Sequence, residues 1–387
     1  MAKEWYIGVM SGTSLDGVDT ALVAIDSPAS GDLADVQPQV TLLASDCYPM
    51  PSALKSALLD VCIGQATNLK HIGELDHQLG VLFADAVNHL LAQTQTDPAH
   101  VKAIGCHGQT VFHQPDGDLP FTMQLGDGNL IAARTGILTV ADFRRKDMAL
   151  GGQGAPLVPA FHRTVFAQHA STTVVLNIGG IANISVLRPE LPVLGYDTGP
   201  GNMLMDAWVY QHRGEKFDRD AAFALEGTVN TPLLRVLLDD AYLSLPYPKS
   251  TGRERYNLLW LEQQLQQAGL LAEGALTVSA ADVQATLLAF TAATIADQVE
   301  MFRLGDHPVL SVCGGGACNP ALMAQLAERL PRWHVTTTRE AGIDPDYMEA
   351  MAFAWLARQR VHGLPSNVPE VTGASRAASL GVIYSAD

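Results

Sequence analysis

Two segments of this 387-residue chain share one pattern, and that pattern constrains the fold more than any other feature of the sequence. One is WYIGVMSGTSLDGVDTALVAI near the start, and the other is TVVLNIGGIANISVLR from Thr173 to Arg188. Each runs from β-forming residues through a bend of Gly with Ser, Thr, Asn or Asp into a second β-forming run, which is typical of a β-hairpin. Two such hairpins predict two related halves.

Helical patterns follow each hairpin. The stretch IGELDHQLGVLFADAVNHLLAQ repeats apolar residues at three and four positions, and DVQATLLAFTAATIADQVEMFRL leads into the apolar run PVLSVCGGG. Strands alternating with helices predict an α/β fold of two related domains, 1–170 and 171–387. No Pro/Ser linker separates them, so we expect the halves to pack together and to bind a ligand in the cleft between them.

Composition excludes several classes of partner. With 48% hydrophobic and 17% charged residues, the chain is expected to be an ordinary soluble globular protein. A formal charge of −16 argues against broad binding of nucleic acid or anionic membranes. Five cysteines without a CxxC pair suggest neither a disulfide framework nor a zinc ribbon and favour a reducing cytoplasm. The start of the chain turns polar too early for a signal peptide, and no apolar run approaches a membrane span of roughly 18 residues.

The first bend has the chemistry of a phosphate-binding loop. Glycine lets backbone N–H groups approach a ligand, neighbouring hydroxyls add donors, and Asp16 and Asp19 could hold Mg²⁺. A plain hairpin turn is the alternative. The chain has no Gly-Lys dipeptide, hence no Walker A loop, and no strand leads into GxGxxG. The candidate nucleotide-binding residues of this bend are Gly12, Thr13, Ser14, Leu15, Asp16, Gly17, Val18 and Asp19, with Asp19 also the candidate metal ligand.

Two further glycine clusters complete the candidate nucleotide site. The second hairpin supplies Asn177, Gly179 and Gly180, and CGGGACNPALMAQLAERL supplies Gly314, Gly315, Gly316 and Asn319. Consecutive glycines at a strand end let a flat group such as adenosine lie against the backbone, and a following helix N-terminus favours negative charge. Tight packing of strand against helix is the alternative for this cluster.

In this order the motifs resemble the superfamily of sugar kinases, actin and heat-shock ATPases. LNIGGIANISVL resembles its second phosphate hairpin and CGGGACNP its adenosine motif, although Asn177 stands where such hairpins often have Asp. GVMSGTSLDGVD, CHGQTVFH, ADFRRKDMALGGQGAPLVP, LNIGGIANIS, GYDTGPGN and GGGACNP together resemble the anhydro-N-acetylmuramic acid kinases over nearly the whole chain. The resemblance implies an enzyme that uses ATP and Mg²⁺ to phosphorylate O6 of 1,6-anhydro-N-acetylmuramic acid while water opens the anhydro bridge. It also implies cytoplasmic recycling of cell-wall sugar and a small amino-sugar partner, and a homodimer is left open.

Opening the bridge needs a carboxylate that activates water. Asp197 in GYDTGPGN follows a strand-like run and precedes a helical one, and the resemblance places the base in this motif, so Asp197 is the candidate catalytic residue. Capping the helix that follows is its alternative role. Asp142 and Asp147, which flank FRRK, are the other candidates for the base.

The candidate sugar contacts centre on FRRK, the densest basic run in an acidic chain. The planar fork of Arg144 or Arg145 suits the lactyl carboxylate of muramic acid, while a solvated surface run is the alternative. The candidate substrate-binding residues are His107, Gln109, Thr110, Arg144, Gly201 and Asn202.

Two other functions remain open from the sequence. One is a chaperone-like or filament-forming ATPase of the same superfamily, although ADFRRKDMALGGQGAP has no evident purpose there. The other is a metal-dependent member suggested by His107 and His113, whose spacing matches neither HxxxH nor HExxH.

Overall fold

The computed structural model describes residues 3–12, 15, 17–26, 38–62, 64–168, 170–247, 249–252, 255–272, 275–340 and 342–387. The chain divides into two compact units, one of residues 1–165 with 342–387 and one of residues 166–341. The assignment of 171–387 to a single second domain is therefore wrong for its last part. Residues 342–387 belong to the first unit because the long helix in this segment packs on the first sheet.

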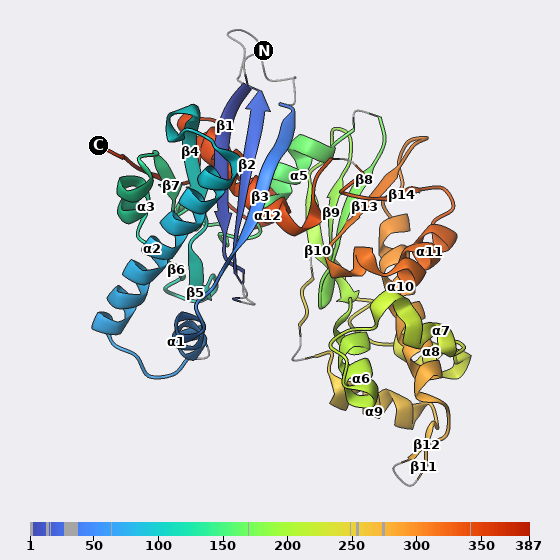
Figure 1. Cartoon of the computed structure of the whole chain (residues 1–387). Coiled ribbons are helices and arrows are strands. Elements are labelled where there is room, and N and C mark those ends of the chain that lie inside the picture. The colour runs from blue at the N-terminus through green and yellow to red at the C-terminus, as the bar shows by residue number, and fades with distance from the viewer. Residues whose placement is uncertain are drawn as a thin grey trace. The chain divides into compact units, whose positions relative to one another are not determined.

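The first unit is built on a six-stranded sheet (Figure 1). Its order is β15 (Val382–Tyr384), β7 (Thr139–Ala141), β4 (Val101–Cys106), β1 (Lys3–Met10), β2 (Gly17–Asp26) and β3 (Val40–Pro49). Strands β1, β2 and β3 are antiparallel, whereas β1, β4 and β7 are parallel. Met10 pairs with Asp19 at the end of the first hairpin, which confirms that prediction. A separate hairpin joins β5 (Gln109–Gln114) and β6 (Phe121–Leu125).

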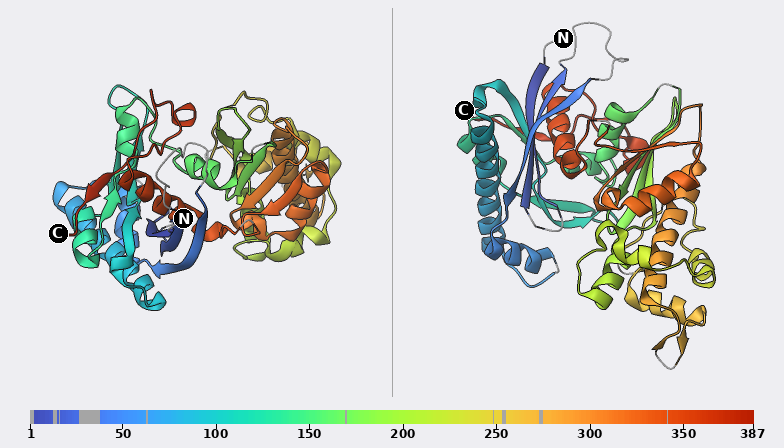
Figure 2. Two further views of the ribbon diagram at one scale, coloured as in Figure 1. Left: turned by 90° about the horizontal axis from the view of Figure 1, so that it is seen from above. Right: turned by 45° about the vertical axis from the view of Figure 1, so that its right-hand side comes forward.

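Helices α2 (Leu69–Thr94) and α12 (Met348–Val361) cover opposite faces of this sheet (Figure 2). Ile7 and Val9 belong to the core cluster that α2 completes. Gly8 lies between them and faces the other way, because successive residues of a strand alternate between faces. There the backbone of α12 comes so close that a Cβ on Gly8 would collide with the Ala350 carbonyl. The remaining helices of the unit are α1 (Ser52–Cys62), α3 (Gly128–Thr135), α4 (Arg144–Ala149), α5 (Val158–Phe166) and α13 (Pro369–Thr372).

The second unit repeats the strand arrangement of the first. Its five-stranded sheet has the order β10 (Leu194–Pro200), β9 (Ile181–Leu187), β8 (Thr173–Ile178), β13 (Val309–Cys313) and β14 (His334–Thr337). Strands β8, β9 and β10 are antiparallel, and β8, β13 and β14 are parallel. The second predicted hairpin is thereby confirmed, as is an α/β fold of two related domains. The short pair β11 (Leu271–Ala272) and β12 (Ala275–Leu276) lies apart from this sheet.

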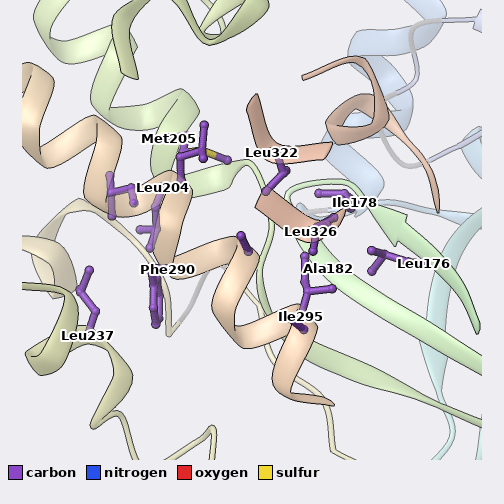
Figure 3. Packing of buried hydrophobic residues seen from close by; sticks show 14 of the residues in the cluster. Leu176, Ile178, Ala182, Leu204, Met205, Leu237, Phe290, Ile295, Leu322 and Leu326 are labelled. Atoms are coloured by element: carbon purple, nitrogen blue, oxygen red, sulfur yellow. The ribbon is translucent and has the colours of Figure 1, made fainter. Parts of the chain in front are cut away.

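A large apolar core holds the helices of the second unit against its sheet. Strand residues Leu176 and Ile178 meet Ile295 of α10 (Ala280–Glu300) and Leu322 and Leu326 of α11 (Pro320–Arg329) in one buried cluster (Figure 3). The other helices are α6 (Met203–Arg213), α7 (Ala222–Glu226), α8 (Thr231–Leu238) and α9 (Leu258–Gln267). This core fixes the loops that follow β8, β10 and β13. Among the described residues of both units, no helix is long and apolar enough to cross a membrane.

Candidate functional site

Three of the predicted motifs meet at one edge of the second sheet. The Gly201 N–H donates to the Gly180 carbonyl at 2.9 Å, and the Asn202 N–H donates to the Gly179 carbonyl at 2.8 Å. Asn202 Nδ2 donates to the Ile178 carbonyl at 3.2 Å. A Cβ on Gly314 would collide with Asn177, so the third glycine cluster lies against the same hairpin. The structure therefore brings together the predicted residues of the β8–β9 bend, the GPGN turn and the GGG turn.

The glycines of this edge fall into two groups. A Cβ on Gly201, Gly314 or Gly316 would collide with neighbouring atoms of the β8–β9 hairpin, so these glycines let the loops pack on one another. Gly179, Gly180 and Gly315 have no heavy atom within 3.5 Å of a built Cβ, since their nearest contacts are 3.6 to 3.7 Å. Their backbone is the part of the edge that a ligand could approach. Asn319 accepts from the Leu322 N–H and is the N-cap of α11.

Asp197 lies on β10 at a β-bulge. It pairs with Asn183, and the register then shifts so that Gly199 pairs with Ala182. Bulges re-aim side chains and are common beside active sites. Asp197 Oδ2 accepts hydrogen bonds from the Ser250 hydroxyl at 2.9 Å and from the Thr251 N–H at 3.0 Å. The alternative that Asp197 caps the following helix is wrong, because Asn202 occupies the N-cap position of α6 and makes no side-chain capping bond.

The first bend is described only in part, since Thr13, Ser14 and Asp16 lie outside the described residues. A Cβ on Gly12 would meet nothing within 4 Å, so the backbone is open there. Leu15 and Val18 are buried in the core, which leaves only their backbone for a ligand. A Cβ on Gly17 would instead press on Cys47, so Gly17 serves the close pairing of β2 with β3.

Asp19 lies at the start of β2 near a second carboxylate that the sequence reasoning missed. Burial raises the pKa of Asp19, a hydrogen bond with Cys47 opposes the rise, and the Asp346 carboxylate adds to it. Burial raises the pKa of Glu349, the Arg144 charge lowers it, and the Asp19 carboxylate raises it. A cation would relieve the repulsion between the Asp19 and Glu349 carboxylates. No group of three or more His, Cys, Asp or Glu side chains in the described part of the chain is arranged to hold a metal.

Arg144 is tied to His107 at the carboxyl ends of β4 and β7. Its Nε and Nη2 donate to His107 Nε2 at 3.1 and 2.9 Å, and its Nη1 donates to the Gly154 carbonyl at 2.8 Å. Burial, followed by the Arg144 charge, lowers the pKa of His107 to about 3. His107 is therefore neutral at physiological pH, and because Nε2 accepts, the ring proton is on Nδ1. The Nδ1–H group of His107 is a donor with a fixed orientation.

A cavity of about 270 Å³ in the first unit is lined by one of the candidate substrate-binding residues, His107, and by Arg145, the alternative to Arg144. Its lining includes Asp76, His107, Gln124, Asp127, Asp142 and Arg145. Arg145 is largely exposed and donates from Nε to Asp142 Oδ1 at 2.8 Å. Thr110 accepts from Gln124 Nε2 at 3.2 Å, and the buried Gln109 donates to the Thr110 carbonyl at 3.3 Å. His113 Nδ1 lies 3.0 Å from the Thr122 hydroxyl, and His107 Nε2 accepts hydrogen bonds from Arg144.

Asp147 is wrong as an alternative base. It is fully buried, and both carboxylate oxygens are occupied: Oδ1 accepts from Asn367 Nδ2 and the Thr372 hydroxyl, and Oδ2 accepts from the Gly154 N–H. Asp147 therefore joins the GGQGAP loop to Asn367 and Thr372 near the C-terminus. Asp142 lines the cavity and stays an alternative.

Three residues near the candidate site were not identified from the sequence. Glu349 lies in the first turn of α12, and Ser250 and Thr251 belong to the segment YPKST, which carries no regular pattern. The hydroxyl-rich KST next to glycine was the available signal for the latter two. Nothing local connects that segment with Asp197, which lies on a different element of the second unit.

Residues 4–386 match the family described as anhydro-N-acetylmuramic acid kinase. A protein of that name from Vibrio parahaemolyticus is 64% identical over 383 residues, covering 99% of each chain. One from Vibrio cholerae is 61% identical over 385 residues, covering 100% of this chain and 99% of the relative. Among solved structures, a ROK family glucokinase from Streptomyces griseus with glucose and AMPPNP is 13% identical, with 92% of this chain and 99% of that chain covered and a TM-score of 0.38. So distant a likeness is silent on function.

Proposed function

This chain belongs to the anhydro-N-acetylmuramic acid kinase family, and from that premise we propose that it transfers the γ-phosphoryl group of ATP to O6 of 1,6-anhydro-N-acetylmuramic acid while water opens the anhydro bridge. Water adds to C1 and gives a proton to a carboxylate. The C1–O6 bond breaks with its electron pair on O6, and O6 forms the new bond to phosphorus as ADP leaves. The product is N-acetylmuramic acid 6-phosphate.

The observation that carries the proposal is the setting of Asp197. A bulge sets its side chain, and two donors from residues 250 and 251 hold one carboxylate oxygen. A carboxylate that accepts hydrogen bonds stays ionised more readily and can take a proton from water. Asp197 is the base of this proposal, and Asp142 is the alternative.

Each unit has open glycine backbone that would bind part of ATP. Gly12 in the first unit and Gly179, Gly180 and Gly315 in the second would present N–H groups to phosphate or adenosine, because no side chain of their own stands in the way. Asp19, with Glu349 beside it, would hold Mg²⁺, since the ion would relieve the repulsion between the two carboxylates, which adds to the rise that burial causes in the pKa of Glu349. The ion supplies neutralisation of the charge on the phosphates. Such an ion keeps several of its waters, so a closed ring of protein ligands is not required.

The cavity beside His107 would take the sugar. Its lining of His107, Gln124, Asp127 and Asn129 offers donors and acceptors for hydroxyl and acetamido groups. Arg145 lines this cavity, and Arg144 lies behind His107, so Arg145 is the stronger candidate for the lactyl carboxylate. Gly201 and Asn202 hold the loop after Asp197 through their backbone N–H groups, and their contact with the sugar stays a prediction.

The test is analysis of products from 1,6-anhydro-N-acetylmuramic acid and Mg-ATP in oxygen-18 water. We expect one phosphorylated sugar that carries one heavy oxygen at C1, measured by mass spectrometry. Incubation with ATP alone is the control for background hydrolysis. A phosphorylated sugar that retains the anhydro bridge would contradict the coupled reaction. Consumption of ATP without a sugar product would instead favour a chaperone-like or filament-forming ATPase.

This activity places the protein in the recycling of peptidoglycan sugars in the cytoplasm, where ATP is supplied. No nucleic acid or membrane is needed for it. A homodimer stays a prediction that sedimentation of the purified chain would test.

A further inference from the structure

The segment that follows α8 encloses Asp197 from several directions. The Asp197 N–H donates to the Lys249 carbonyl at 3.0 Å, and the Tyr242 hydroxyl donates to the Asp197 carbonyl at 2.7 Å. Ser250 and Thr251 also donate to Oδ2, so four residues of this segment together hold both the backbone and the carboxylate of Asp197. A side chain held in this way has little freedom to rotate.

The segment is itself anchored. Lys249 is only 8% exposed, and its Nζ donates to the Tyr242 and Leu243 carbonyls at 3.2 and 2.8 Å. Burying an ammonium group is costly unless acceptors satisfy it, so these bonds tie Lys249 to the backbone at Tyr242 and Leu243. Ser250 follows Lys249 in the chain, so the position of its backbone is constrained as well. Its hydroxyl is the side-chain donor to Asp197 Oδ2, while Thr251 donates from its backbone.

We propose that Ser250 is a positioning residue for the reaction, whose hydroxyl orients the Asp197 carboxylate toward the water that attacks C1. The inference rests on the proposed function and deepens it. Ser250 forms no bond to the reacting atoms and exchanges no proton with them. It keeps one oxygen of the carboxylate engaged, so the group has a set orientation when water arrives.

The test compares Ser250→Ala, Ser250→Thr and a control, Ser244→Ala, which removes an exposed hydroxyl from the same loop. Loss of a hydrogen bond to a charged group is expected to lower kcat about tenfold in Ser250→Ala. The KM values for ATP and sugar should stay within about twofold, because binding contacts are untouched. The acidic limb of the kcat profile should move to higher pH, since a carboxylate that loses a donor protonates more easily. Ser250→Thr keeps the hydroxyl and should restore most of kcat, and Ser244→Ala should match wild type.

A double-mutant cycle with Asp197→Asn shows whether Ser250 acts through Asp197. Once the carboxylate is gone, adding Ser250→Ala should cost nothing further. An equal loss in both backgrounds, or a Ser250→Ala enzyme with unchanged kcat and unchanged acidic limb, overturns the inference. Thermal melting of every variant separates a folding defect from a catalytic one. Absence of the labelled sugar product from wild type would overturn the proposed function and this inference with it, whereas normal wild-type product with an unaffected Ser250→Ala enzyme overturns the inference alone.

Discussion

Gly12 stands in the first bend with open space where a side chain would be. Gly12→Val should therefore leave the fold intact and obstruct the approach of phosphate to the backbone, with affinity for an ATP analogue falling by on the order of tenfold. Calorimetric titration measures this. Gly73→Val is the control, because Gly73 of α2 is equally open and lies outside the proposed site. Equal affinity of the Gly12 and Gly73 variants would make the bend an ordinary turn.

Arg144 and Arg145 are neighbours in sequence with different surroundings. Arg145→Ala should raise the KM for the sugar about tenfold to a hundredfold and leave the KM for ATP nearly unchanged, for loss of a charged hydrogen bond of roughly 1.5 to 3 kcal/mol. Arg145→Lys should recover part of this, since Lys lacks the planar fork. Arg144→Ala should lower thermal stability as well, because His107 and the Gly154 carbonyl lose their donor. A larger rise of the sugar KM in Arg144→Ala than in Arg145→Ala would assign the carboxylate contact to Arg144, the other residue that the sequence left open.

Asp197→Asn preserves size and removes the basic oxygen. Turnover should fall about a hundredfold to ten-thousandfold while ATP and sugar still bind, as measured by initial rates and by titration of each ligand. Asp142→Asn is the comparison, since Asp142 is the remaining alternative for the base. Near-normal turnover of the Asp197 variant together with collapse of the Asp142 variant would move the base to Asp142.

At the scale of helices and strands, the sequence predicted those elements whose formation depends on residues close together in the chain. Both hairpins, α2 and α10 were recognisable, because their apolar period and turn residues lie within a few positions of one another. The position of α12 could not be predicted in this way. This helix is buried on most sides from Ala350 to Gln359 and lacks the polar face that marks a surface helix. Its partners Gly8 and Gly105 lie far away in the chain.

In the candidate site, too, local sequence patterns predicted some features, and contacts between distant residues determine the others. The glycine clusters were predicted from their letters, yet which glycines pack loops and which stay open depends on atoms from other strands. Gly315 and Gly316 are adjacent, and only Gly316 would collide with Ile178 if it carried a Cβ. The bonds of Ser250 and Thr251 to Asp197 likewise join residues that no local pattern relates.

The different surroundings of Gly315 and Gly316 can be tested by substituting each of them. Gly316→Ala should lower the free energy of unfolding of the second unit by about 1 to 3 kcal/mol, because the new methyl group must displace the packed Ile178 side chain. Gly315→Ala should be close to neutral for folding, since its Cβ would lie 3.6 Å from Asn202 Nδ2. Denaturant unfolding of both variants measures the effect. Equal stability of the two would mean that Ile178 moves aside at little cost.

Asp206 of helix α6 makes a pH-dependent contribution to the free energy of unfolding. Burial, and then the Asp218 carboxylate, raises the pKa of Asp206 to about 6 from an ordinary 3.8. Between these values the folded chain binds more protons than the unfolded one, so the contribution of Asp206 is favourable at low pH and is lost as pH rises through the window. Asp206→Asn should therefore melt progressively higher than wild type as pH increases from about 4 to 6. A difference in melting temperature that is constant across this range would contradict the raised pKa.

For the whole molecule, the division into units predicts which fragments fold. Residues 166–341 contain their own sheet and core and should melt cooperatively alone, as followed by circular dichroism. Residues 1–165 should not, because one face of their sheet lacks α12. Adding residues 342–387 as a separate peptide should restore a cooperative transition. A cooperative transition of 1–165 alone would show that α12 is dispensable for this unit.

The return of residues 342–387 to the first sheet also sets an order of events during synthesis. Domains generally fold as units while the chain emerges, the N-terminal one usually first. Here the strands made earliest must wait with one apolar face uncovered until residues 348–361 have left the ribosome, whereas the unit made in between can close before them. In this protein the first half to be translated is the last to be completed, and its exposed sheet in that interval is the surface that a chaperone would have to protect.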